Sequence, residues 1–407
     1  MRPGSKLEQL PCYLACAAVI AMLFSIAVSE TLVALAMAAL LISGQKMRFP
    51  PILLPIAVFF GLTVISLVFC PDPKGGIPDI RKFYLYFLVP VTLYSTLRTL
   101  RGVRNFLLAA IGMVTLSALW SLVQFGQKVQ TAHALGVPLY TYYVGSRLTG
   151  FTSHWMVLGG QEMMLLLMAS AWFFFAGERQ WKPWLAAAIS IILISVVIGE
   201  TRIIWFGTFC GGAYLIWLWR RWWVFAVPVP ILALLLANPF GLRERAVSMF
   251  HSHGDIDSNT FRYVVLREGW EIIKKHPLLG LGPEQIKAIE VSGDFQKWIP
   301  ADIPRPLPTG WYGHLHNLYV QLAAERGIPA ALAMVWLLLK ILTDFIRGAR
   351  RARDPDARAI LCGTAAMTIG VVAVGFAEYN LGESGVLIPF LGLVVCGYVA
   401  IEQPLAR

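Results

Sequence analysis

The sequence predicts an all-α polytopic membrane protein, and three observations carry that prediction. Hydrophobic residues make up 57% of the 407 residues and charged residues only 14%, whereas soluble proteins carry about 25% charged residues. The hydrophobic residues form long blocks, many of them near the length that a membrane-spanning helix needs. These blocks lack the alternation of polar and apolar residues that is typical of a membrane-spanning strand. We therefore exclude the cytosolic and disordered classes and expect helices.

The blocks define about twelve transmembrane helices. They cover residues 11–29, 31–45, 49–71, 83–97, 105–127, 154–177, 183–199, 203–219, 222–239, 317–343, 359–377 and 384–401. The first block follows Arg2 and Lys6, as in a signal peptide, but a second block starts immediately after it, so an uncleaved first span is expected. We predict a bundle of spans one to nine in residues 1–239, a large periplasmic loop at 240–315, and spans ten to twelve in residues 316–407.

The distribution of basic residues sets the predicted orientation. With the N-terminus inside, the connections on the cytoplasmic side hold most of the Lys and Arg residues of the short loops, as the positive-inside rule requires. Both termini are then cytoplasmic, and all seven histidines lie on the outer side. We therefore expect the chemistry on that side. The cytoplasmic loops also explain the net charge of +11, so no nucleic-acid partner is predicted.

The periplasmic loop is predicted to be partly helical. Between Phe261 and His276, apolar residues recur at helical spacing, which predicts an amphipathic helix of about four turns along the membrane surface. Its expected apolar stripe consists of Tyr263, Leu266, Trp270 and Ile273. Four prolines between residues 300 and 308 predict an irregular segment.

Polar residues at the outer ends of the spans are the candidate site. Asn317, Gln321 and Glu325 share one helical face because they are spaced by four residues, and such a stripe faces a bundle interior or a wet cavity. Arg202 opens span eight, where its planar fork can engage phosphate oxygens. Arg147 precedes span six.

A metal site is the weaker alternative. His251, His253, Asp255 and Asp257 offer nitrogen and oxygen ligands, but the sequence has neither an HExxH motif nor a Cys pair. We interpret this segment as a solvated loop and predict no metal.

Three separated motifs resemble those of the O-antigen ligase and polymerase superfamily of bacterial envelope glycosyltransferases. Thr201-Arg202-Ile-Ile-Trp205 is similar to the family's Thr-Arg-x-x-Trp motif. Arg262 through His276-Pro-Leu-Leu-Gly280-Leu-Gly282 resembles its loop helix and the turn that follows. His316-Asn317 resembles its His-Asn signature. The resemblance implies a GT-C-like glycosyltransferase of about twelve helices, multi-pass in the bacterial inner membrane, with a periplasmic active site.

The implied reaction transfers O-antigen polysaccharide from undecaprenyl diphosphate to lipid A–core oligosaccharide, which forms lipopolysaccharide. The donor, the acceptor and membrane lipids are the expected partners. The transfer is expected to invert the anomeric carbon, to be metal-independent, and to need no cofactor and no ATP, because the diphosphate bond is already activated.

The resemblance also implies roles for individual residues. The expected catalytic residues are His316, Arg202, Arg262 and His314. The expected diphosphate- or glycan-binding residues are Arg202, Arg262, Arg147, Arg267, Asn317 and Gln321. A neutral histidine can accept the proton of the acceptor hydroxyl, and His316 is the first choice. Alternative bases are Glu162, Glu200 and Glu325.

Other functions stay open at this point. An O-antigen polymerase or a protein O-oligosaccharyltransferase shares these motifs and differs in the acceptor. A polysaccharide or lipid transporter is the non-enzyme alternative, although transporters usually place ionisable residues near the midplane and contain repeated halves.

Overall fold

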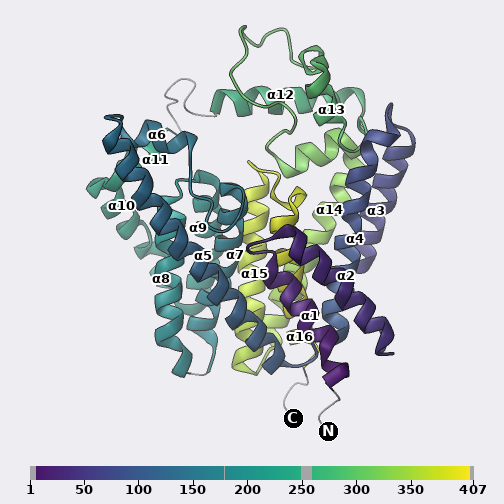
Figure 1. The fold of residues 1–407 in the computed structure, drawn as a ribbon, viewed down its shortest axis with the longest axis vertical. Coiled ribbons are helices and arrows are strands. Elements are labelled where there is room, and N and C mark those ends of the chain that lie inside the picture. The colour runs from purple at the N-terminus through teal and green to yellow at the C-terminus, as the bar shows by residue number, and fades with distance from the viewer. Residues whose placement is uncertain (1–5, 178, 249–258, 404–407) are drawn as a thin grey trace.

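The computed structural model describes residues 6–177, 179–248 and 259–403 (Figure 1). Every regular element in this part of the chain is a helix. The alternative metal ligands His251, His253, Asp255 and Asp257 lie outside the described residues, as do the terminal residues Arg2 and Arg407.

Each predicted span overlaps at least one helix of the structure, although the break between the first two helices lies at residues 22–25, inside the predicted first span. The helices are α1 (Lys6–Ala21), α2 (Ile26–Ile42), α3 (Leu53–Val68), α4 (Pro73–Thr96), α5 (Leu100–Ala134), α7 (Trp155–Phe175), α8 (Lys182–Ile198), α9 (Arg202–Arg220), α10 (Pro228–Ala237), α14 (Leu318–Arg351), α15 (Pro355–Gly375) and α16 (Ser384–Ile401). Among the described residues, six helical segments are long and apolar enough to cross a membrane, or seven if the bent segment of residues 202–237 is one span. The all-helical polytopic class is confirmed, and the number of twelve crossings stays a prediction.

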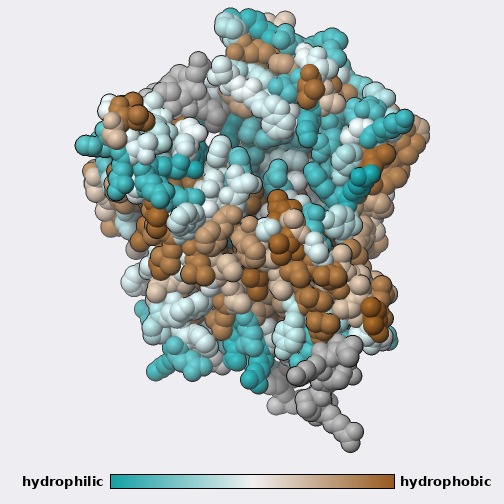
Figure 2. All heavy atoms as spheres, in the orientation of Figure 1, coloured by the Kyte–Doolittle hydropathy of each residue, from teal (hydrophilic) through white to brown (hydrophobic). Residues whose placement is uncertain are grey.

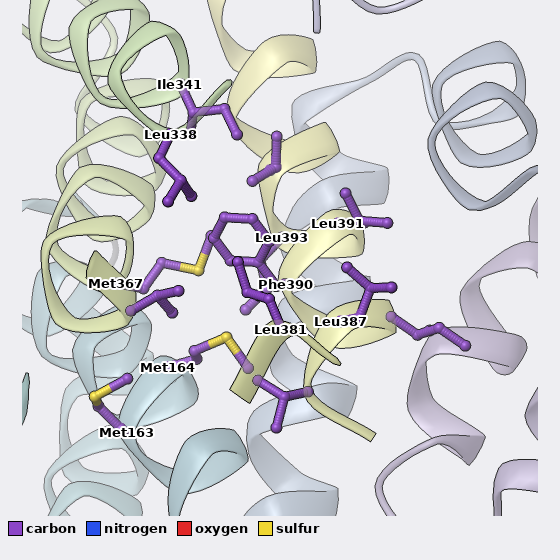
Figure 3. Packing of buried hydrophobic residues seen from close by; sticks show 14 of the residues in the cluster. Met163, Met164, Leu338, Ile341, Met367, Leu381, Leu387, Phe390, Leu391 and Leu393 are labelled. Carbon is purple, nitrogen blue, oxygen red and sulfur yellow. The ribbon is translucent and has the colours of Figure 1, made fainter. Parts of the chain in front are cut away.

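The core of the bundle lies where α7, α15 and α16 meet. Figure 3 shows Met163 and Met164 of α7, Met367 of α15, and Phe390 and Leu393 of α16 packed together. Lipid chains are as apolar as these side chains, so close packing, rather than escape from water, holds such helices together.

Glycines bring α9 close to α15. A Cβ atom at Gly211 would lie 2.6 Å from the backbone oxygen of Ala366, and one at Gly207 would lie 2.9 Å from that of Gly370. Small residues four positions apart are the usual means of close helix approach in membranes.

A broad hydrophobic band runs across the middle of the molecule, and hydrophilic residues gather at the two ends of the molecule (Figure 2).

The predicted periplasmic loop folds over one end of the bundle. Its main element is α12 (Asn259–Lys275), which crosses that end above α14 (Figure 1). The helix was predicted, but its predicted stripe is only partly buried. Ile273 is buried with Phe261, Val265 and Ile272, whereas Tyr263 and Trp270 are 53% and 54% exposed.

The Pro-Leu-Leu-Gly-Leu-Gly turn after α12 docks into a break in α14. Leu281 and Gly282 donate backbone hydrogen bonds to the carbonyl oxygens of Ala324 and Glu325, at 2.9 and 2.7 Å. At Gly327, φ is +83° and the helix is interrupted; a Cβ atom there would lie 1.9 Å from a backbone oxygen of the turn. The glycines therefore allow two backbones to touch, which fixes the C-terminal end of α12 on α14.

Candidate functional site

A cavity of about 1040 Å³ lies at the end of the bundle that α12 covers. Its walls come from the loop after α6 (Leu139–Gly145), from α12, from residues 309–316 and from the connection between α15 and α16. Its floor includes Met22, Phe24 and Ile26 from the turn between α1 and α2. Figure 2 shows a hydrophilic recess at this end of the molecule, with hydrophobic residues below it. The cavity thus joins a polar upper part to an apolar base.

His316 lies in this cavity because Asn317 begins α14. The Asn317 side chain accepts hydrogen bonds from the amides of Tyr319 and Val320, both at 3.0 Å, as an N-cap does. Its amide group also donates to the carbonyl oxygen of Phe376, at 2.7 Å. His316 therefore precedes a fixed helix start, with φ at +46°, a conformation that non-glycine residues rarely adopt.

Gln321 supports the same turn from below. It is buried, and its side-chain oxygen accepts a 2.7 Å hydrogen bond from the amide of Leu315. Neither Asn317 nor Gln321 lines the cavity. The predicted polar stripe thus holds the histidine segment in place.

Glu378 joins His316 to Arg262. Its carboxylate lies 3.2 Å from Nδ1 of His316 and 3.4 Å from a guanidinium nitrogen of Arg262. Arg262 also donates to the carbonyl oxygen of Ala377, at 2.7 Å. Burial acts to raise the pKa of Glu378, but the hydrogen bond and charge of His316 and the charge of Arg262 lower it to about 2. The carboxylate is therefore ionised.

His314 lies against His316, with the ring centroids 3.8 Å apart. Its Nδ1 accepts the backbone amide of His316, at 3.2 Å. Burial first, and then the neighbouring imidazole, lower the pKa of His314 to about 4. His314 is therefore neutral at pH 7 and orients the backbone of His316.

Arg147 reaches the cavity from the opposite wall. Its guanidinium lies 5.7 Å from the ring centre of Trp155, and the His154 ring stacks on Trp155 at 4.1 Å. Burial, with the nearby charge of Arg245, lowers the pKa of Arg147 to about 9. It still carries its charge at neutral pH, so two guanidinium groups, those of Arg147 and Arg262, line one cavity.

Other predicted residues lie elsewhere. Arg202 does not line the cavity but contacts Ser248 and Asn259. Arg267 forms an exposed ion pair with Asp302. Three further predicted residues, the alternative bases Glu162, Glu200 and Glu325, are also absent from the cavity walls. Of the groups that could accept a proton, the cavity brings His316 and Glu378 together.

The donor atoms of His314, His316 and Glu378 lie within 4.8 Å of one another, a spacing that a cation could use. However, Glu378 already contacts His316 and Arg262, and the guanidinium groups of Arg262 and Arg147 would repel a cation. The two arginines, which line the cavity with the carboxylates of Glu378 and Glu383, therefore disfavour a metal ion at this cluster.

Sequence reasoning missed Glu378. A weak signal was present, because Glu378 directly follows predicted span eleven on the side that holds all the histidines. Nothing in the sequence places it beside His316, 62 positions earlier.

The fold and the cavity define a multi-pass membrane protein with a cavity lined by arginine and histidine side chains at one end of its bundle. Residues 185–335 match the O-antigen ligase family. The resemblance drawn from the motifs is confirmed over this range. The family implies ligase- or polymerase-type activity on a glycan–lipid substrate. A comparison with curated proteins gives no match.

The matched range contains Arg202, Arg262, His314 and His316. Arg147 and Glu378 lie outside it, although both line the cavity together with Arg262, His314 and His316. The complete site therefore needs segments on both sides of the matched domain.

Proposed function

We propose that this protein is an O-antigen ligase that transfers a glycan from undecaprenyl diphosphate to lipid A–core oligosaccharide. The observation that carries the proposal is the single cavity, where Arg147, Arg262 and the His316–Glu378 pair lie above an apolar floor. A substrate with an anionic head and an apolar tail would match the polar upper part and the apolar base of the cavity. We place the cavity at the periplasmic face of a bacterial inner membrane, with both chain termini in the cytoplasm.

The lengths of α1 and α2 support entry of the lipid from the side. They contain 16 and 17 residues, or roughly 24–26 Å at 1.5 Å per residue, which is less than the hydrocarbon thickness of about 30 Å. In Figure 1 their connecting turn lies well below the outer ends of α3 and α5. Phe24 and Ile26 of this turn are 44% and 48% exposed. A polyprenyl chain in the outer leaflet can therefore pass over the turn into the base of the cavity.

The proposed reaction is an inverting displacement at the anomeric carbon. The acceptor hydroxyl oxygen forms the new C–O bond while the bond from this carbon to the diphosphate oxygen breaks, and its electron pair leaves with the diphosphate. His316 accepts the hydroxyl proton, and the ionised Glu378 holds the imidazole and stabilises its charged form. Arg147 and Arg262 stabilise the negative charge that grows on the leaving group. These guanidinium groups supply the charge that a metal ion would otherwise provide.

The identity of the acceptor distinguishes an O-antigen ligase from the alternative enzymes. A polymerase would use a second lipid-linked glycan, and an O-oligosaccharyltransferase would use a protein hydroxyl, in the same cavity with the same donor. A transporter would move the lipid-linked glycan without breaking its bond to diphosphate.

The test uses purified full-length protein in lipid nanodiscs with an undecaprenyl-diphosphate glycan, lipid A–core and EDTA, and without ATP. We expect glycan attached to the core, and loss of at least 100-fold in rate for His316→Ala and Arg262→Ala. Arg243→Ala, an exposed arginine on the same external side, serves as the control and should keep its rate. A ladder of longer lipid-linked glycans with unmodified core would establish a polymerase instead. Movement of intact donor across vesicles, without any transfer, would establish a transporter.

A further inference from the structure

Arg202, the first residue of α9, holds two segments that are distant in the sequence. Its guanidinium donates to the backbone and side-chain oxygens of Ser248, at 2.8 and 3.2 Å, and to the side-chain oxygen of Asn259, at 2.6 Å. The amide group of Asn259 in turn donates to the carbonyl oxygen of Ser248, at 2.6 Å. The three residues thus form a closed triangle of hydrogen bonds.

A second set of bonds fixes this triangle to the start of α9. The Ser248 hydroxyl donates to the carbonyl oxygen of Arg245, at 2.8 Å. The buried side chain of Arg245, in α11 (Leu242–Val247), donates to the carbonyl oxygen of Glu200, at 2.9 Å. Glu200 has φ at +49°, and such a conformation persists only where its surroundings hold it. The start of α9, the end of α11 and the start of α12 are therefore one connected unit.

The position of Asn259 links this unit to the cavity. Asn259 is the first residue of α12, and Arg262 follows three positions later, so the two side chains are neighbours on one helical face. The guanidinium group of Arg262 is held by the carbonyl oxygen of Ala377 and the carboxylate of Glu378. The direction in which α12 starts therefore determines where Arg262 points.

We propose that Arg202 is a positioning residue, which acts on the diphosphate only by holding Asn259 and so aiming Arg262 into the cavity. This inference rests on the proposed function, in which Arg262 binds the diphosphate. The planar guanidinium group of Arg202 reaches acceptors on two segments at once. A lysine ammonium group on its flexible stem has no such fixed geometry. Arg202→Lys should therefore behave like Arg202→Ala.

The decisive experiment is a double-mutant cycle of Arg202 and Arg262. Transfer rates and the KM for the lipid-linked donor would be measured for Arg202→Ala, Arg262→Ala and the double variant in nanodiscs. If Arg202 acts through Arg262, its loss should raise the donor KM at least 10-fold in the native background and change it less than 2-fold once Arg262 is gone. The acceptor KM should stay unchanged. An equal loss in both backgrounds would mean that Arg202 contacts the diphosphate itself, which would overturn the inference.

Asn259→Ala provides a second test that keeps the charge of Arg202. We expect it to reproduce the donor effect of Arg202→Ala, whereas Thr260→Ala, the exposed neighbour on the same helical turn, should leave it unaltered. A native donor KM for Asn259→Ala would also overturn the inference, even if Arg202→Ala fails to fold. Failure of the proposed function looks different, because transfer would then survive both Arg262→Ala and His316→Ala.

Discussion

Glu378→Gln tests whether the carboxylate beside His316 contributes to the proposed transfer. The change keeps the size of the side chain and an oxygen acceptor but removes the charge that faces His316 and Arg262, at 3.2 and 3.4 Å. A hydrogen bond to a charged group is worth about 1.5–3 kcal/mol. The side chains of His316 and Arg262 are 20% and 27% exposed. We therefore assign the lower end of this range to each contact, which gives about 3 kcal/mol for the two contacts together. That corresponds to roughly a 100-fold lower kcat/KM.

The assay is initial-rate transfer from the undecaprenyl-diphosphate glycan in nanodiscs, with the unfolding midpoint of each variant measured in parallel. Asp302→Asn is a matched control, since Asp302 also pairs with an arginine of α12, Arg267, but is 63% exposed; exposed pairs contribute about 1 kcal/mol or less. We expect its kcat/KM to fall less than 5-fold. A native kcat/KM for Glu378→Gln in a folded protein would refute the assigned role of the carboxylate.

Three further predictions concern stability. Burial first, and then the charge of Glu290, raise the pKa of Glu268 to about 8, so the folded state keeps a proton that the unfolded state loses above about pH 4.5. The free energy of unfolding therefore falls as the pH rises from about 4.5 to about 8 and then levels off, so Glu268→Gln should raise the unfolding midpoint at pH 8.5 but hardly at pH 5; equal shifts would contradict this. Asp79→Asn removes the carboxylate that pairs with Arg326, whose side chain is only 4% exposed. It should lower the free energy of unfolding, measured with denaturant, by about 3–5 kcal/mol. A decrease below about 1 kcal/mol would show that the charge of Arg326 is solvated. Gly327→Ala places a Cβ atom 1.9 Å from a backbone oxygen and should lower the unfolding midpoint by several degrees; an unchanged midpoint would mean that the turn moves freely.

Much of the fold follows from local sequence. Runs of apolar residues predict helices because a backbone in lipid must satisfy its hydrogen bonds within one segment, and each predicted span overlaps a helix. The Asn317 position is also a local feature, since an asparagine before an apolar run caps a helix. The same reasoning fails for α12, where apolar residues recur on two faces. Only tertiary contact selects Phe261 and Val265 over Tyr263 and Trp270.

The site itself depends on contacts that local patterns do not encode. The sequence predicts that Arg262 and His316 share one side of the membrane, and the structure brings them to one carboxylate, Glu378. The chemistry of an arginine side chain is likewise not enough to predict its partner. Arg202 and Arg147 both precede a span on the predicted outer side, yet Arg147 lines the cavity, and Arg202 holds the start of α12.

The charges in the cavity give a last prediction, on the pH dependence of transfer. Glu378, with a pKa of about 2, and His314, with a pKa of about 4, keep their charge states between pH 5 and 8, and Arg147, with a pKa of about 9, stays protonated. An acidic limb of kcat/KM in this range must therefore come from a group other than these three. Burial raises the pKa of Glu200 to about 7, so this carboxyl group is one candidate. We expect His314→Gln and Glu200→Gln to leave the midpoint of the limb in place. A shift of the midpoint in Glu200→Gln would assign the limb to that carboxyl group and remove the pH evidence for an imidazole base.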